Sequence, residues 1–183
     1  MKKTILSLAL ASASLLSISA AQAADGTIAI NGSITASTCT INGGNPMPPI
    51  ELGNVSATTL DTAGKVSTGI PFQIAVTGCT LAAGETGVRA KFGGNMAAAD
   101  GTLSLTGAGT AGVATNVAVE LANMDAASTP IVVGDVTTSD SFTVVGAAGA
   151  GAATMRYQAY YKALGVAGPG TANTTVDFDL DFI

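Results

Sequence analysis

Few side chains in this 183-residue sequence could do chemistry, because histidine is absent altogether. The thiols belong to Cys39 and Cys79, and acidic residues alternate near the C-terminus at Asp177, Asp179 and Asp181. Without histidine, neither a Ser-His-Asp nor a Cys-His arrangement can be assembled. Hydrolysis by carboxylates alone stays open on residue types, but we expect no catalytic residue, no metal site and no cofactor.

The three C-terminal acids alternate with the apolar residues Val176, Phe178, Leu180 and Phe182. This alternation puts the acids on one polar face of a strand, with neighbours about 7 Å apart along the chain. Calcium normally binds carboxylates and carbonyls that converge from a loop. The pattern therefore predicts a solvated strand face, not a calcium site or a catalytic carboxylate pair.

A second motif, GAGTAG at residues 107–112, has the spacing of a dinucleotide-binding loop. Such a loop needs a following helix whose N-terminus faces the pyrophosphate. The strand-like stretch 116–121 follows instead. We interpret the motif as a surface turn.

The first 23 residues have the pattern of a signal peptide. Lys2 and Lys3 precede the mostly apolar run 5–20, and residues 21–23 (AQA) form a small-any-small cleavage site. An apolar run of about 16 residues is short for a membrane span, and no later stretch is continuous enough to be one. We expect the chain to be exported and to begin, once mature, at Ala24, with no direct membrane insertion.

Export decides how the cysteines and the charge are interpreted. In an oxidising compartment the default for Cys39 and Cys79 is one disulfide, which closes a loop of about 41 residues and stabilises the fold by roughly 4 kcal/mol. A reactive thiol or a metal pair would lack a histidine partner. Removal of the leader leaves five basic residues against twelve acidic ones, a net charge of −7. Because the basic residues are scattered, we expect no nucleic-acid partner.

The 160 residues that follow the leader alternate short apolar stretches with Gly, Asn, Asp, Thr and Pro, the pattern of strands and turns. The apolar residues of these stretches are Ile50, Leu52, Phe72, Ile74, Val76, Val88, Ala90, Phe92, Leu103, Leu105, Val117, Val119, Leu121, Ile131, Val133, Phe142, Val144, Met155, Tyr157, Ala159, Tyr161, Val176, Phe178, Leu180 and Phe182. About nine strands without a helical period, at the length of one domain, predict an all-β antiparallel sandwich. We interpret the Gly- and Ala-rich run 146–153 as a flexible connection.

The stretch 25–35, DGTIAINGSIT, stands between the leader and the first cysteine. Ile28, Ile30 and Ile34 fall at alternate positions, and Gly32 occupies the place of a fourth apolar residue. A glycine inside a strand usually marks the close approach of another backbone or side chain. We interpret the stretch as a strand that completes the sheet of another molecule.

Together these features resemble the chaperone-usher pilins of Gram-negative bacteria, and most of all the major shaft subunits of type 1-like fimbriae. The resemblance rests on the leader, the alternating strand, the cysteine pair, and the tracts TNVAVEL at 115–121 and RYQAYY at 156–161. It also rests on Gly170, the fourteenth residue from the end, and on the aromatic Phe182 in the penultimate place. Two positions depart from the family pattern: Ile183 replaces a polar last residue, and Phe182 replaces the more usual tyrosine.

The resemblance implies an incomplete immunoglobulin-like sandwich that lacks its final strand. It implies a signal peptide over residues 1–23, an N-terminal donor-strand extension over 24–36 and a pilin domain over 37–183. In such pilins a periplasmic chaperone lends a strand to the open groove and holds the terminal carboxylate, and at an outer-membrane usher the extension of the next subunit replaces that strand. The implied donor residues are Ile28, Ile30, Gly32 and Ile34. The implied groove-edge residues, which pair with the chaperone, are Gly170, Val176, Phe178, Leu180, Phe182 and Ile183.

The implied function is that of a structural subunit of an adhesive fimbria at the cell surface, which polymerises head to tail with identical or related pilins. Two alternatives stay open: a minor adaptor or tip-associated subunit, and a secreted enzyme on a β-sandwich. A tip adhesin normally adds a lectin domain and has no donor strand, whereas this chain has a donor-like strand and no room for a lectin domain. An adaptor would carry the same features as a shaft subunit.

Overall fold

The computed structural model describes residues 34, 36–94, 96 and 98–183. The chain divides into two units, Met1–Ile34 and Thr35–Ile183, and the second unit contains the strands described below. The predicted leader and the predicted donor residues Ile28, Ile30 and Gly32 lie outside the described residues. The boundaries proposed for the leader and for the extension therefore stay predictions.

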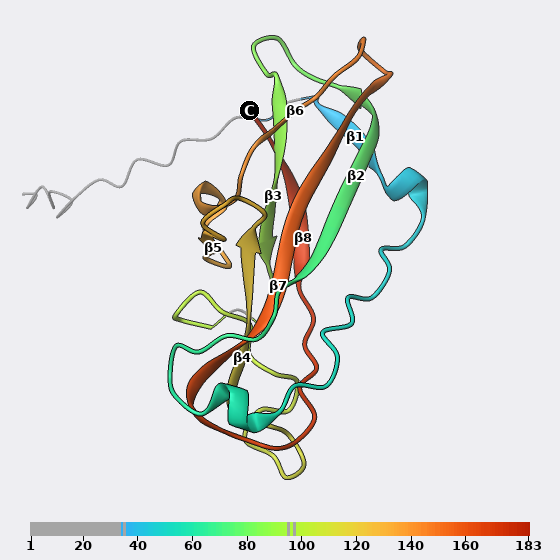
Figure 1. Cartoon of the computed structure of the whole chain (residues 1–183). Helices are drawn as coiled ribbons and strands as arrows, with labels where there is room; N and C mark the ends of the chain where they lie inside the picture. Colours follow the sequence, from blue (N-terminus) through green and yellow to red (C-terminus); the bar gives the residue numbers. More distant parts are fainter. Residues whose placement is uncertain (1–33, 35, 95, 97) are drawn as a thin grey trace, which may run out of the picture. The chain divides into compact units, whose positions relative to one another are not determined.

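The regular elements of the second unit are mainly strands, joined by long loops (Figure 1). They are β1 (Thr38–Ile41), β2 (Ile70–Thr80), β3 (Gly87–Gly93), β4 (Thr115–Asn123), β5 (Pro130–Ile131), β6 (Phe142–Thr143), β7 (Gly151–Gly168) and β8 (Asp177–Phe182). Three short 3₁₀ turns lie between them, η1 (Asn42–Gly44), η2 (Ala57–Leu60) and η3 (Val136–Thr138). Across the described part of the chain, no helix is long and apolar enough to cross a membrane.

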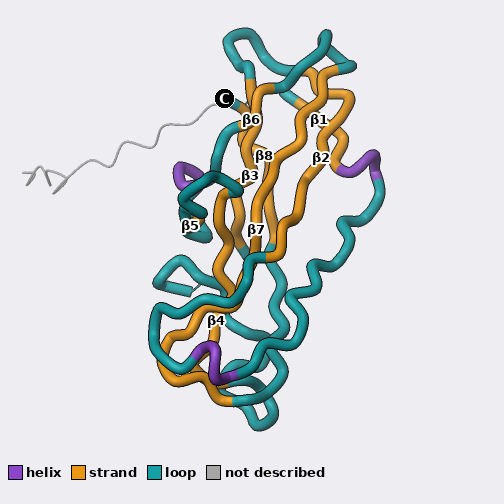
Figure 2. Tube along the Cα trace, viewed as in Figure 1, coloured by secondary structure: helices purple, strands orange, loops and turns teal. Residues whose placement is uncertain are grey.

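The strands form two antiparallel sheets (Figure 2). One has five strands in the order β1-β2-β7-β4-β5, and the other has three in the order β6-β3-β8. Most consecutive strands belong to opposite sheets, so the chain crosses repeatedly from one layer to the other. The predicted all-β antiparallel sandwich is confirmed.

The core lies between the sheets and is built from the inward residues of alternating strands. Its fully buried members include Ile74, Val76, Val88, Ala90, Phe92, Leu121, Met155 and Tyr157. The phenol oxygen of Tyr157 accepts a hydrogen bond from the backbone N–H of Ala90 at 3.2 Å, and its ring lies edge-on to Phe92, with centroids 5.1 Å apart. Burial raises the pKa of Tyr157 to about 12, so the neutral phenol is the form that the core accepts.

The run 146–153 is only partly a connection, which corrects the prediction. Strand β7 already begins at Gly151, where Ala152 pairs with Val145 and Ala153 with Val76. A Cβ at Gly151 would lie 2.7 Å from the Val144 side chain and 3.1 Å from the Cys79 carbonyl oxygen. The small residues here serve close packing between chain segments.

Two predicted strands are absent or reduced. Ile50 and Leu52 lie in an irregular segment, where Pro48 and Pro49 remove backbone donors that a ladder would need. Leu103 forms an isolated bridge to Val119 and not a strand of its own. Apolar alternation predicted both, but a strand also needs a partner along its length.

Candidate functional site

Within the described chain, strand β8 is paired on one side only. It joins β3 in antiparallel register, with Phe178 opposite Phe92, and it is the last strand of its sheet. Along its other side the described residues supply no strand. An edge of this kind presents backbone N–H and C=O groups to which an extended segment can add itself.

The inward side chains of β8 are incompletely covered. Phe178, Leu180 and Phe182 pack against the core but remain half-buried. The residues that precede them at the same alternation, Val176 and Ala172, are half-buried as well. Apolar residues that face a core without being closed off mark a place where a further layer can bury them.

Beside this edge lies a groove of about 1100 Å³ that opens between the two sheets. Core residues of both sheets reach its floor, so the groove is a direct opening into the apolar interior. Its lining includes Phe72, Ile74, Phe92, Val119, Leu121, Ala159 and Tyr161 on the strands, with Val176 and Phe178 on the side of β8. The groove is therefore a space between the two sheets that a further apolar strand could fill.

Another wall of the groove is the segment Met47–Val55, which follows η1 and is a loop along its length (Figure 2). Met47 and Leu52 pack against the main core, and Val55 packs against a smaller cluster around Leu60. The site residues predicted from the sequence did not include this segment. The sequence did contain a signal for this segment, namely an apolar stretch whose prolines keep it from pairing as a strand by itself.

Gly170 also lines the groove, and close contacts explain why this position holds a glycine. A Cβ at this position would lie 2.4 Å from the backbone nitrogen of Ala114 and 2.4 Å from the carbonyl carbon of Val113. Just after it, Thr171 donates its N–H to the Gly112 carbonyl at 2.8 Å and accepts from the Ala114 N–H at 2.9 Å. The close contact aligns the segment that leads into β8.

The far end of β8 is also fixed. The backbone oxygen of Ile183 accepts from the N–H groups of Thr86 and Gly87, at 2.6 and 2.9 Å, and its N–H donates to the Gly87 carbonyl at 3.1 Å. The Ile183 side chain is 39% exposed. The groove-edge residues predicted from the sequence therefore follow one another along a single strand and the segment before it.

The acidic residues of β8 lie on the polar face of the strand, as predicted, and none of them lines the groove. Asp181 forms an ion pair with Arg89 of β3 at 2.7 Å, and Asp179 stands opposite Lys91. Within residues 34, 36–94, 96 and 98–183, no three acidic or cysteine side chains form a group that could hold a metal ion. The motif 107–112 forms exposed turns ahead of β4.

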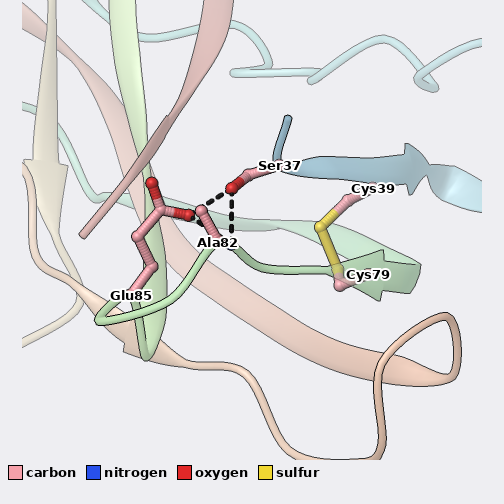
Figure 3. Close-up of a disulfide and its surroundings, with 5 residues drawn as sticks. All are labelled: Ser37, Cys39, Cys79, Ala82 and Glu85. Atoms are coloured by element: carbon pink, nitrogen blue, oxygen red, sulfur yellow. Dashed lines mark hydrogen bonds between the residues drawn. A yellow bond between two sulfur atoms is a disulfide. The ribbon is translucent and has the colours of Figure 1, made fainter. Parts of the chain in front are cut away.

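The predicted disulfide joins Cys39 of β1 to Cys79 of β2, with their Cα atoms 4.2 Å apart (Figure 3). It links β1 covalently to its neighbour β2 within the five-stranded sheet. Of the predicted donor residues, Ile34 alone is described, and its side chain is exposed. The donor role of all four residues stays a prediction.

Comparisons with known proteins agree with this geometry. The model of the family described as "Fimbrial protein" matches residues 28–182. The F17 fimbrial protein of Escherichia coli is 34% identical over 91% of this chain and 92% of its own length. The major fimbrial subunit SMF-1 of Stenotrophomonas maltophilia is 35% identical over 88% and 94%. Among solved structures, a subunit of a chaperone-usher pilus superposes with a TM-score of 0.58 at 22% identity, covering 87% of this chain and 96% of that one.

The sandwich of two antiparallel sheets is the immunoglobulin-like fold of chaperone-usher pilins. The chain belongs to the fimbrial protein family. It is a structural subunit of surface fimbriae.

Proposed function

We propose that this subunit polymerises by donor-strand exchange, in which the extension 24–36 of one copy fills the groove beside β8 of the next. The observation that carries the proposal is the edge of β8 that no described strand pairs with, beside an apolar groove of about 1100 Å³. The family match supports the role of the extension, because it begins at Ile28 and so includes the alternating stretch.

The chemistry of the two surfaces is complementary. Ile28, Ile30 and Ile34 would enter the groove, and burial of each is worth roughly 1.5 to 3 kcal/mol. The donor backbone would satisfy the free edge of β8. Gly32 would lie where the groove floor leaves no room for a side chain.

The exposed groove is also the reason for proposing a chaperone and an usher. An apolar trough beside a free strand edge is an aggregation site. We propose that a periplasmic chaperone fills it first, by pairing with Val176, Phe178, Leu180 and Phe182, and that an outer-membrane usher oversees the exchange. The proposal assigns the chain no catalytic step.

Head-to-tail donation is a heterologous contact that does not close on itself, so its product is a filament. A strand inserted in a closed sandwich leaves slowly, which makes the filament kinetically stable. We propose a shaft position, since the relatives include a major fimbrial subunit. A minor adaptor position is the second candidate.

The donor role is tested by Gly32→Val, with Ala29→Val as the matched control on the opposite face of the predicted strand. Gly32→Val should leave binding of the chaperone intact and stop fibre growth, because the added methyl groups meet the groove floor. Ala29→Val should grow fibres normally. Normal fibres from Gly32→Val, seen by electron microscopy, would contradict the donor role.

The place in the fibre is tested on purified surface material. On a denaturing gel, unboiled samples of a strand-donated homopolymer should give a ladder, and boiling in acid should collapse it to one band. A band that is a minor component among other subunits would favour the adaptor position.

A further inference from the structure

The loop between β2 and β3, residues 81–86, contacts the start of the domain. The Ser37 hydroxyl donates to the Glu85 carboxylate, and the Ala82 N–H donates to the Ser37 oxygen at 2.9 Å and to Glu85 Oε2 at 3.0 Å (Figure 3). Three groups thus bond to one another around the residue at which the predicted extension joins the domain. We call this set the Ser37–Glu85 latch.

The loop is held from the opposite side as well. Its last residue, Thr86, donates its N–H to the Ile183 oxygen and accepts from the Val144 N–H at 3.0 Å. The next residue, Gly87, is buried, and a Cβ there would lie 3.0 Å from the Phe142 oxygen. The loop therefore rests against β6 and the end of β8, and it offers a fixed anchor.

The latch moves the first fixed point of the domain along the chain. Without it, that point would be Thr38, the first residue of β1, which stands opposite Thr80 of β2. With it, that point is Ser37, which directly follows the extension 24–36. Neither Ser37 nor Glu85 lines the groove beside β8, so the groove itself gives no reason for the latch.

We propose that Ser37 and Glu85 are positioning residues for strand donation, which fix the point and direction from which the extension leaves its own domain. This inference rests on the proposed function. An extension held by side-chain and backbone hydrogen bonds at Ser37 samples fewer orientations than one that pivots at Thr38, so it meets the groove of a neighbour in the productive direction more often.

The test uses the mature chain and two rates. Uptake of a synthetic peptide of residues 24–36 measures how well the groove accepts a strand. Fibre elongation measures acceptance and donation together. Ser37→Ala should slow elongation about fivefold and leave peptide uptake within about twofold of the wild-type rate. Two conservative single variants should keep most of the wild-type elongation rate. They are Ser37→Thr, which keeps the hydroxyl, and Glu85→Gln, which keeps an acceptor oxygen.

Ser67→Ala is the matched control. Its hydroxyl also accepts from a backbone N–H, that of Tyr161 at 3.0 Å, but it lies away from the start of the domain. It should change neither rate. Wild-type elongation by Ser37→Ala, or an equal loss of peptide uptake, would overturn the positioning role. Failure of the wild-type chain to take up the peptide would overturn the proposed function and this inference with it.

Discussion

Strands β3 and β8 are neighbours in one sheet with the same alternation of apolar and polar residues, yet they are buried to different degrees. On β3 the inward residues Val88 and Ala90 are 0% exposed and Phe92 is 3% exposed. On β8 the inward residues Phe178 and Phe182 remain half-buried. The chemistry of the side chains is alike, so their environment makes the difference.

The environment differs in the number of neighbours. Strand β3 lies between β6 and β8, and the Phe92 carbonyl also accepts from the Gly134 N–H at 2.9 Å. Strand β8 has β3 on one side and, within the described residues, the groove on the other. An apolar strand pattern thus states that a face will be buried, but the partner that buries it need not belong to the same chain.

The difference in burial between β3 and β8 is tested most directly at the facing pair Phe92 and Phe178. Phe92→Ala should lower the free energy of unfolding by about 3–5 kcal/mol, because the ring is only 3% exposed and packs against Phe72 and Tyr157. Phe178→Ala should cost about half as much in the free domain, because its ring is already partly in water. Chemical denaturation measures both, with and without bound peptide 24–36. Peptide should raise the cost of Phe178→Ala more than that of Phe92→Ala, because the half-buried ring has more surface left to cover; equal costs in the free domain would contradict the difference between the strands.

The disulfide lies in the other, five-stranded sheet, and its contribution to the free energy of unfolding can be tested in the same way. Replacement of both Cys39 and Cys79 by Ser should lower the free energy of unfolding by about 4 kcal/mol, because the unfolded chain regains the freedom of a 40-residue separation. Urea denaturation of the oxidised wild type and of the double variant gives the value. An unchanged midpoint would show that the bridge does not constrain the unfolded chain.

Two glycines sharpen the comparison, because one leads into β8 and the other ends β3. Gly170→Ala should cost about 1–3 kcal/mol, since its Cβ would meet the backbone of Val113 and Ala114 at 2.4 Å. Gly93→Ala is the control: its Cβ would have no atom within 4 Å, so the change should stay within about 0.5 kcal/mol. Thermal unfolding of the two variants checks the prediction. A Gly170→Ala variant as stable as Gly93→Ala would argue against close packing at the base of the groove.

The smallest effect is expected where β3 and β8 share an ion pair. Asp181→Asn removes the partner of Arg89, whose side chain is 23% exposed against 37% for Asp181. Exposed pairs are worth little, so the loss should be about 0.5 kcal/mol and should shrink in high salt. Asp179→Asn, on the same face, serves as the reference. A loss of several kcal/mol for Asp181→Asn would mean that the pair is more deeply desolvated than its exposure indicates.

Much of the fold could be predicted from local pattern. Strands β2, β3, β4, β7 and β8 have clear alternation, and export made a disulfide the default for the two cysteines. What alternation could not show is which edge stays open, because Phe92 and Phe178 have the same pattern. The groove wall Met47–Val55 was not predicted for a related reason. Its apolar residues predict a strand, but its prolines and the lack of a pairing strand leave it irregular.

Contacts between remote segments were also beyond the sequence. No local signal joins Ser37 to Glu85, which are 48 residues apart. The close approach that requires glycine at position 170 comes from the turn at 112–114, far away in the chain. The family resemblance supplied the glycine, and the structure supplies its reason.

The bridge between β1 and β2 also determines how the domain bears a mechanical load. A pull on the chain ahead of Cys39 reaches β2 through a covalent bond, so the four-residue strand β1 does not have to carry it. From β2 the tension passes into β7, an 18-residue strand held by β2 on one side and β4 on the other. Tension along these strands loads many backbone hydrogen bonds together in shear. Such a domain resists extension through its longest ladders and not through its weakest edge.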